Sequence, residues 1–205
     1  MTTVLVATWS EGIAVVTDSG IDGDLPGQPV RGLTSDGAGG ALAIVGGRSL
    51  CRRTPDREWQ TIASTEVELS TAVVVGDAIF VGTDDARVLR VSSRGRVEPL
   101  EGFQSVAGRE TWFAGSAMID GQVVGPPLGV RSITATSDGA VLLANVHVGG
   151  IPRSTDGGAT WEPTIAVESD VHEVRAHPER PEIVVAAAAV GFCRSRDAGA
   201  GIVPI

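Results

Sequence analysis

The stretch Ser154-Thr-Asp-Gly-Gly-Ala-Thr-Trp161 decides which fold the sequence predicts. Serine, threonine and aspartate side chains close tight turns by accepting hydrogen bonds from nearby backbone amides, and glycine adopts the positive φ that such turns need. The pattern therefore predicts a turn between two strands, with the final tryptophan packed under the sheet. Residues 52–59 form an incomplete copy that keeps the tryptophan, and residues 195–202 form one that keeps serine, aspartate and glycine.

The same turn recurs within a longer repeat. Stretches beginning at residues 30, 69, 130 and 171 each contain an opening strand, a turn rich in polar residues or glycine, an apolar strand, a short link and a third strand. The apolar residues at the third strands are Ile13, Leu50, Val88, Ile151 and Phe192. Their spacings are 37, 38, 63 and 41 residues, so three of the four suit a propeller blade of about 40–50 residues.

Alternating strand patterns recur throughout the chain, and no long stretch has helical periodicity. We therefore predict an all-β protein, a β-propeller of four-stranded antiparallel blades, with a β-sandwich as the alternative. A single domain, 1–205, is expected to divide into a partial blade at 1–29, blades at 30–68 and 69–101, an inter-blade insertion at 102–129, a blade at 130–168 and a partial blade at 170–205.

This division gives about four to five blades at the usual repeat length. The first repeat lacks an opening strand, and the last ends inside an incomplete copy of the turn. We expect either a truncated or frameshifted copy of a longer propeller or five modules that close a small ring. In the first case, the missing blades are either supplied by another chain or lost.

The complete turn and the repeats resemble those of the Asp-box (BNR) repeat β-propellers. That group includes sialidases, xyloglucan-active glycosidases, sortilin-type receptors and photosystem II assembly factors. The resemblance implies a structural turn at the edge of a blade, away from the ligand face, formed by Ser154, Asp156, Gly158, Thr160 and Trp161. It indicates a fold and leaves the activity open.

Composition excludes some classes of function. The chain has 205 residues, 25 acidic and 16 basic, all of the basic ones arginine, and a net charge of −9, so nucleic acid is not an expected partner. The sequence has no basic leader and no apolar run of bilayer length, so we expect a cytoplasmic protein without membrane contact. Cys51 and Cys193 occupy equivalent positions in different repeats, too far apart for a disulfide, and should be buried.

In a propeller, the starts of the first strands and the links between second and third strands open on one face. The residues expected on this ligand-binding face are Arg31, Arg109, Trp112, Arg131, His147 and His172. The alternative for Arg31 and Arg131 is simple pairing with neighbouring carboxylates. The three histidines lack the close spacing of a metal pair on adjacent strands, so the sequence predicts no metal and no cofactor.

The resemblance to sialidases implies three arginines for a substrate carboxylate, a tyrosine nucleophile and an aspartate acid/base. Arg31, Arg109 and Arg131 could supply the first part, but the chain contains no tyrosine, which excludes that chemistry. A glycosidase with two carboxylates is the alternative, and its candidate acids are Glu110, Asp84 and Asp170. Their spacing singles out no pair. We therefore expect a non-catalytic propeller that binds a protein or a small carbohydrate-like ligand.

Overall fold

The computed structural model describes residues 3–115, 117–125 and 127–205. Within these ranges, the chain forms one three-stranded sheet, four four-stranded sheets and a separate two-stranded hairpin, all antiparallel. The first sheet consists of β1 (Thr3–Thr8), β2 (Gly12–Thr17) and β3 (Gly20–Asp24).

In each four-stranded sheet, the strands pair with their neighbours in chain order. The second sheet consists of β4 (Val30–Ser35), β5 (Ala41–Val45), β6 (Ser49–Arg53) and β7 (Trp59–Ser64). The third consists of β8 (Leu69–Val75), β9 (Ala78–Thr83), β10 (Val88–Val91) and β11 (Val97–Pro99). The fourth consists of β14 (Val130–Ala135), β15 (Leu142–Val146), β16 (Pro152–Ser154) and β17 (Glu162–Pro163). The fifth consists of β18 (Val171–Ala176), β19 (Val184–Ala188), β20 (Gly191–Ser195) and β21 (Val203–Pro204).

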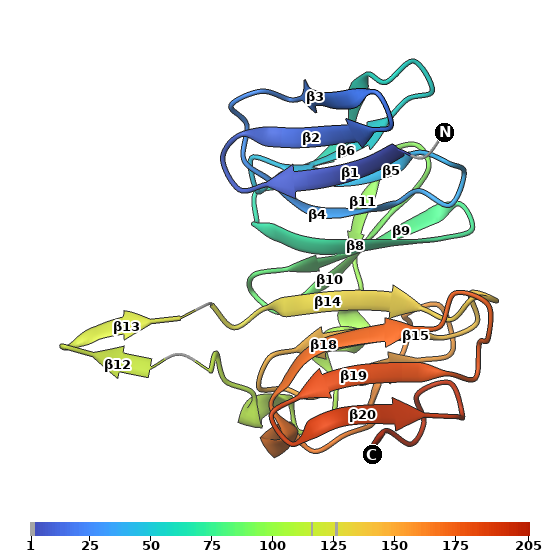
Figure 1. Cartoon of the computed structure of the whole chain (residues 1–205). Helices are drawn as coiled ribbons and strands as arrows, with labels where there is room; N and C mark the ends of the chain where they lie inside the picture. Colours follow the sequence, from blue (N-terminus) through green and yellow to red (C-terminus); the bar gives the residue numbers. More distant parts are fainter. Residues whose placement is uncertain (1–2, 116, 126) are drawn as a thin grey trace.

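The five sheets follow one another as the blades of a β-propeller (Figure 1). The first and last sheets lie at opposite ends of the molecule, and no hydrogen bond between described residues joins them. The five modules therefore form an arc, and the small closed ring, one of the two alternatives expected from the sequence, is not observed.

Strand β5 shows why the second strands are almost wholly apolar. All five of its residues are buried. Leu42 and Ile44 pack in the cluster shared with the third sheet, whereas Ala43 and Val45 pack in the cluster shared with the first. Because successive side chains of a strand point to opposite faces, a blade between two neighbours must be apolar on both.

The last sheet is more complete than its sequence indicates. Residues 170–205 were expected to form a partial blade, but β21 supplies a fourth strand that pairs Pro204 with Cys193 and Val203 with Arg194. A strand of two residues has too little alternation for a sequence pattern to reveal it. Cys51 and Cys193 are both buried and carry free thiols.

The segment expected to be an insertion at 102–129 has two parts. The first contains α1 (Glu101–Gln104) and the 3-10 turn η1 (Arg109–Thr111), and it packs Phe103 and Trp112 into the core between the third and fourth sheets. The second is the hairpin of β12 (Ala117–Ile119) and β13 (Gln122–Val124), which projects from the body (Figure 1). Another 3-10 turn, η2 (Val167–Ser169), precedes β18. Within the described residues, no helix is long and apolar enough to cross a membrane.

The turn from Ser154 to Trp161 is closed by its own side chains. The Ser154 hydroxyl donates to the Asp156 carboxylate at 2.8 Å and accepts from the Gly158 amide at 2.9 Å. The other Asp156 oxygen accepts from the Thr160 hydroxyl at 2.6 Å. The buried Trp161 ring packs edge-on against Phe103, with ring centroids 5.1 Å apart. The turn thus ties the fourth sheet to the segment before it.

The incomplete copy at 195–202 has the same arrangement. Ser195 donates to Asp197 and accepts from the Gly199 amide at 2.9 Å. Gly158 and Gly199 both have positive φ, of 90° and 83°. A Cβ at Gly158 would lie 2.5 Å from Leu100, and one at Gly199 would lie 2.4 Å from Leu143. Glycine at this position therefore lets the first turn pack closely against Leu100, just after β11, and the second against Leu143 in β15.

Replacing the tryptophan under the turn tests how much this packing contributes. Trp161→Ala should lower the free energy of unfolding by about 3–5 kcal/mol, the usual cost of removing a buried large aromatic side chain. Ile21→Ala, in a side chain that is 73% exposed, is the control and should change it by less than about 1 kcal/mol. Urea denaturation measures both, and similar losses would contradict the packing described.

The turn also predicts a dependence of stability on pH. Hydrogen bonds from Thr160 and Ser154 lower the pKa of Asp156 from 3.8 to about 2. Because folding lowers this pKa, the contribution of Asp156 to stability is present above about pH 4 and is lost as the pH falls towards 2.

We expect Asp156→Asn to be less stable than the wild type at neutral pH and to lose less stability between about pH 5 and pH 2. Asp77→Asn, in the exposed turn between β8 and β9, is the control, and its stability should depend on pH as that of the wild type does. Thermal melting across this pH range is the measurement. Parallel curves for the wild type and Asp156→Asn would show that the carboxylate does not stabilise the turn.

Candidate functional site

The first strands of the four-stranded sheets lie next to one another, and each has an irregular register near its start. In β8, β14 and β18, the pairing skips one residue: Ser70, Arg131 and His172, respectively. In β4, the irregularity lies between Arg31 and Thr34. Such bulges re-aim side chains and are common beside functional sites. They point to the ends of the first strands as the candidate site.

A cluster of charged side chains lies at the starts of β4 and β14. Arg31 contacts both Glu68 and Asp84 at 3.1 Å, and Arg48 contacts the other oxygen of Glu68 at 2.9 Å. Arg131 lies 3.9 Å from Asp84 and donates to the carbonyl oxygen of Pro127. We call these five side chains the arginine cluster. It brings Arg31 and Arg131 together around the carboxylate of Asp84. Pairing of these two arginines with neighbouring carboxylates was the alternative to ligand binding in the sequence analysis.

Several polar atoms of the arginine cluster have no protein partner. The Nε atoms of Arg31 and Arg131 and Oδ1 of Asp84 are buried and make no hydrogen bond with another described residue. Burial lowers the pKa of Arg131, and the nearby Asp84 partly opposes this shift. Buried polar atoms are usually paired in folded proteins, so a group of unpaired ones marks a place where water or a ligand can bind.

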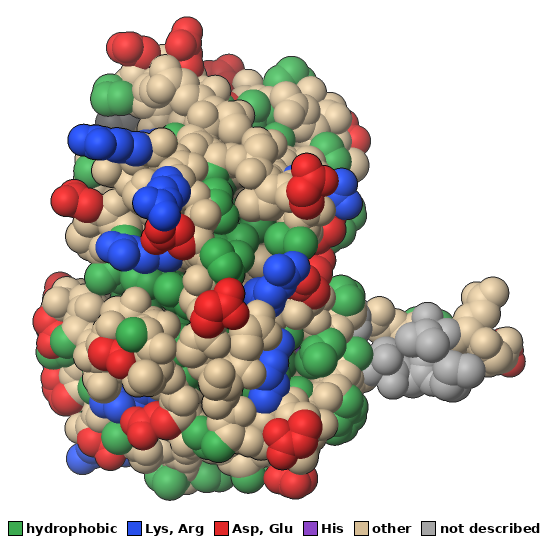
Figure 2. All heavy atoms as spheres, turned by 180° about the vertical axis from the view of Figure 1, so that it is seen from behind, with side chains coloured by type: hydrophobic (Ala, Val, Ile, Leu, Met, Phe, Trp, Pro, Cys, Tyr) green, Lys and Arg blue, Asp and Glu red, His purple; other side chains and the backbone are tan. Residues whose placement is uncertain are grey.

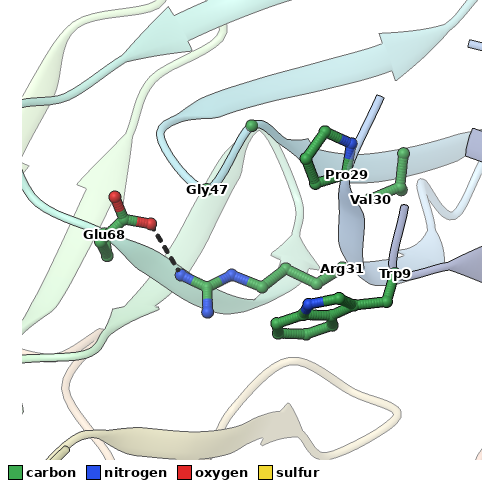
Figure 3. A pocket seen from close by; sticks show the side chains of 7 residues that line it. Trp9, Pro29, Val30, Arg31, Gly47 and Glu68 are labelled. Carbon is green, nitrogen blue, oxygen red and sulfur yellow. Dashed lines mark hydrogen bonds and ion pairs between the residues drawn. The ribbon is translucent and has the colours of Figure 1, made fainter. Parts of the chain in front are cut away.

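A cleft of about 230 Å³ opens beside this cluster (Figure 3). Its lining residues are Trp9, Pro29, Val30, Arg31, Gly46, Gly47 and Glu68. In Figure 3, the guanidinium of Arg31 points to Glu68. The Trp9 side chain is 74% exposed, which is unusual for so large an apolar group. The cleft thus combines a free indole surface with a fixed guanidinium.

Arg109 and Trp112 do not join the arginine cluster. The Arg109 guanidinium stacks over Trp112 at 4.7 Å from the ring centroid and donates to the carbonyl oxygen of Ala86 at 2.8 Å. Trp112 is itself buried in the core against Phe103. The expectation that both residues present themselves to a ligand is corrected, because the insertion folds back into the space between two sheets. The three arginines therefore form no triad.

A second cluster lies at the start of β18. Nε2 of His147, in the link after β15, lies 3.1 Å from Oδ1 of Asp170. The His147 and His172 rings have centroids 5.1 Å apart. One ligand atom from each of the three residues lies within 4.8 Å of the other two, an arrangement able to hold a metal ion. We call these three residues the histidine cluster. It places His147 and His172, both expected on the ligand-binding face, next to each other.

The insertion positions the histidine cluster. The amide of Phe113 donates to Val148 at 3.1 Å, which lays the segment after η1 alongside the link that carries His147. A Cβ at Gly115 would lie 2.6 Å from Nδ1 of His147, so glycine allows this close approach. A cleft of about 550 Å³ opens beside it, lined by Thr111, Phe113, Gly115, Val148, Val167, Glu168 and Asp170.

The three candidate acids have different surroundings. Asp84 belongs to the arginine cluster and Asp170 to the histidine cluster, whereas Glu110 lies exposed on η1. No ion pair or hydrogen bond between described side chains links any two of them. The geometry therefore supplies no reason to pair them as acid and base.

Two residues with unusual surroundings were not predicted from the sequence as site residues. Glu68, just before β8, bridges Arg31 and Arg48, and only the three-dimensional structure brings these together. Asn145 is fully buried in β15, and neither polar atom of its amide has a partner among the described residues. The sequence feature that could have revealed Asn145 is that it is the only asparagine of the chain and lies within an apolar strand.

On the face shown in Figure 2, arginine side chains lie among acidic ones over both halves of the molecule. This face therefore has no continuous basic surface of the kind that binds a phosphate backbone.

Comparison with known proteins supports the fold. No family model matches the sequence, and no curated protein matches it. Among solved structures, YCF48 from Cyanidioschyzon merolae has a TM-score of 0.63 and 15% identity over 95% of this chain and 66% of its own. The computationally designed Ika8 protein has a TM-score of 0.60 and 11% identity over 99% of this chain and 58% of its own. The extracellular domain of the putative hybrid two-component system BT4673 from B. thetaiotaomicron has a TM-score of 0.68 and 14% identity, over all of this chain and 26% of its own.

The chain thus spans less than two thirds of the length of each of these structures. TM-scores of 0.60–0.68 show a shared fold, whereas identities of 11–15% carry no activity across to this chain.

The arginine cluster predicts an effect on stability. Asp84→Ala removes the carboxylate that Arg31 and Arg131 both approach, and it should lower the free energy of unfolding by about 1–3 kcal/mol. Glu98→Ala is the control, because its pair with the 78%-exposed side chain of Arg96 should contribute no more than about 1 kcal/mol. Urea denaturation of both variants is the measurement, and equal losses would contradict a shared role for Asp84.

Proposed function

We propose that this chain is a non-catalytic binding module of the Asp-box repeat class. Two turns support the assignment to that class, because 154–161 and 195–202 share the same serine–aspartate–glycine hydrogen bonds. The module would use the face where the first strands begin, and its occupant would be a protein segment or a small carbohydrate-like ligand.

The cleft beside Trp9 carries this proposal. Arg31 is held by two carboxylates at 3.1 Å, so its guanidinium is fixed before any ligand arrives. The exposed indole of Trp9 offers a flat apolar surface in the same cleft. Tryptophan and arginine dominate binding energies at interfaces, and a group that is already ordered loses little entropy on binding. A peptide or a sugar ring with nearby polar groups would suit this combination.

The same contacts argue against glycoside hydrolysis at this cleft. Hydrolysis by two carboxylates needs one free acid and one free base or nucleophile on either side of the sugar. Glu68 and Asp84 both contact the guanidinium of Arg31, so neither carboxylate is free to face a sugar on its own. The chain also has no tyrosine to act as a nucleophile. Binding without turnover is the function that these groups support.

Removing the indole tests the proposal. The probes are peptides with free carboxyl termini, sialylated oligosaccharides and xyloglucan oligosaccharides, each titrated calorimetrically into the full chain. We expect at least one of these probes to bind, and Trp9→Ala to weaken it at least about tenfold, as the loss of a binding hot spot does.

Phe192→Ala is the matched control, because Phe192 is an aromatic side chain 52% exposed on the last sheet. Both substitutions should leave the free energy of unfolding within about 0.5 kcal/mol of the wild type. Equal weakening by both variants, or no binding of any probe, would count against this cleft as the site. Hydrolysis of either oligosaccharide by the wild type would overturn the non-catalytic assignment.

A further inference from the structure

The histidine cluster contains an electrostatic conflict that a bound cation resolves. Nδ1 of His147 lies 3.3 Å from the carbonyl oxygen of Ala114. A carbonyl oxygen can only accept, so Nδ1 must carry the proton. In the neutral ring, Nε2 then has a lone pair, and this atom lies 3.1 Å from a carboxylate oxygen of Asp170. Two acceptors at this distance repel one another unless a cation lies between them.

The carboxylate of Asp170 also lacks a hydrogen-bond donor. Oδ1 of Asp170 is buried and lacks a hydrogen-bond partner among the described residues, so its contact with His147 does not have hydrogen-bond geometry. Asp170 has a φ of 49° because it is the left-handed residue that ends η2, and this turn fixes the carboxylate beside His147.

We propose that His147, Asp170 and His172 bind a divalent transition-metal ion, with zinc as the ion that suits them best. Two imidazoles and a carboxylate are a common ligand set for zinc, with bonds of about 2.0–2.2 Å. A tetrahedron with such bonds has edges of roughly 3.4 Å, close to the 3.1 Å between Nε2 of His147 and Oδ1 of Asp170. The third ligand atom, from His172, already lies within 4.8 Å of both.

The surroundings of His147 match those of a metal ligand. A metal-bound histidine generally donates its other ring N–H to a carbonyl or carboxylate, which fixes the tautomer and aims the ring. The Ala114 carbonyl oxygen plays this part for His147, and Gly115 leaves room for the ring. The insertion thus positions the first ligand, and the bulge in β18 re-aims the last, His172.

Three protein ligands leave at least one coordination position open. Asp170 also lines the cleft of about 550 Å³ that contains Phe113 and Glu168. An ion bound to the histidine cluster would therefore lie at the edge of a cleft, within reach of a further oxygen or nitrogen ligand. This site is separate from the cleft of Trp9, so the inference does not depend on the proposed function.

Zinc chloride added to the full chain after treatment with a chelator tests the proposal. By isothermal titration calorimetry, we expect one zinc ion per chain. His172→Ala and Asp170→Asn should each weaken binding at least about tenfold, because even the loss of a residue that only supports a ligand costs about 10–100-fold in affinity. Both variants should fold, since His172 is exposed and asparagine accepts the left-handed conformation of residue 170.

The chain provides its own control in His177, the only other histidine. Its Nδ1 accepts from the amides of Glu179 and Arg180, in the turn between β18 and β19. His177→Ala should bind zinc as the wild type does. Cobalt(II) in place of zinc should give ligand-field absorption without a thiolate charge-transfer band, because Cys51 and Cys193 take no part.

Three results would overturn the proposal. The first is the absence of saturable zinc binding by the wild type, which would leave a proton as the cation between His147 and Asp170. The second is unchanged affinity in both His172→Ala and Asp170→Asn. The third is a thiolate band in the cobalt spectrum together with loss of binding in Cys51→Ser or Cys193→Ser, which would place the ion elsewhere.

Discussion

Face-to-face packing between successive sheets is the constraint on which the structure depends. Each internal sheet is apolar on both faces, and its strands are buried only because another sheet lies on either side. The turns extend this packing, since Gly158 lies against Leu100 and Gly199 against Leu143 of the preceding sheet. Between the third and fourth sheets, Phe103 and Trp112 from the insertion add large side chains to the shared core. Stability in such an array comes mainly from the contacts between neighbours.

The same packing produces the candidate site. Because the first strands lie next to one another, a bulge near the start of each sends polar side chains to a common face. Arg31 and Arg131 are 100 positions apart in the chain, yet both approach Asp84. The unpaired polar atoms described for the arginine and histidine clusters lie on this face. The turns from Ser154 and Ser195, in contrast, satisfy their polar groups internally and act as structural elements.

Local chemistry made much of the fold predictable from the sequence. The opening strand expected from residue 30 is observed as Val30–Ser35, and Asp156 makes hydrogen bonds to Ser154 and Thr160 within its own turn. Period, turn residues and apolar runs are properties of short segments, and a sequence displays them directly. The pairing of Arg31 with carboxylates was foreseen as an alternative, although Glu68 was not identified as a partner.

Features that depend on distant segments were not predictable. The burial of Trp112 follows from the insertion folding back between two sheets, and no local pattern distinguishes this from an exposed loop. The histidine cluster joins a link after β15 to residues around the start of β18. Spacing rules for metal ligands within adjacent strands therefore missed it, and the sequence predicted no metal. The bulges were not predictable either, because a bulge is defined by how a strand pairs with its neighbour. One skipped residue changes which side chains reach the site.

The bulges near the starts of the first strands bring polar groups from separate sheets to one face of the molecule. A long-range ¹H–¹⁵N correlation spectrum of the imidazole rings, recorded with and without zinc chloride, tests this at the level of single atoms. We predict that Nε2 of His147 and one ring nitrogen of His172 shift together with one equivalent of zinc, whereas both nitrogens of His177 stay unchanged. Equal shifts in all three rings, or in none, would contradict it.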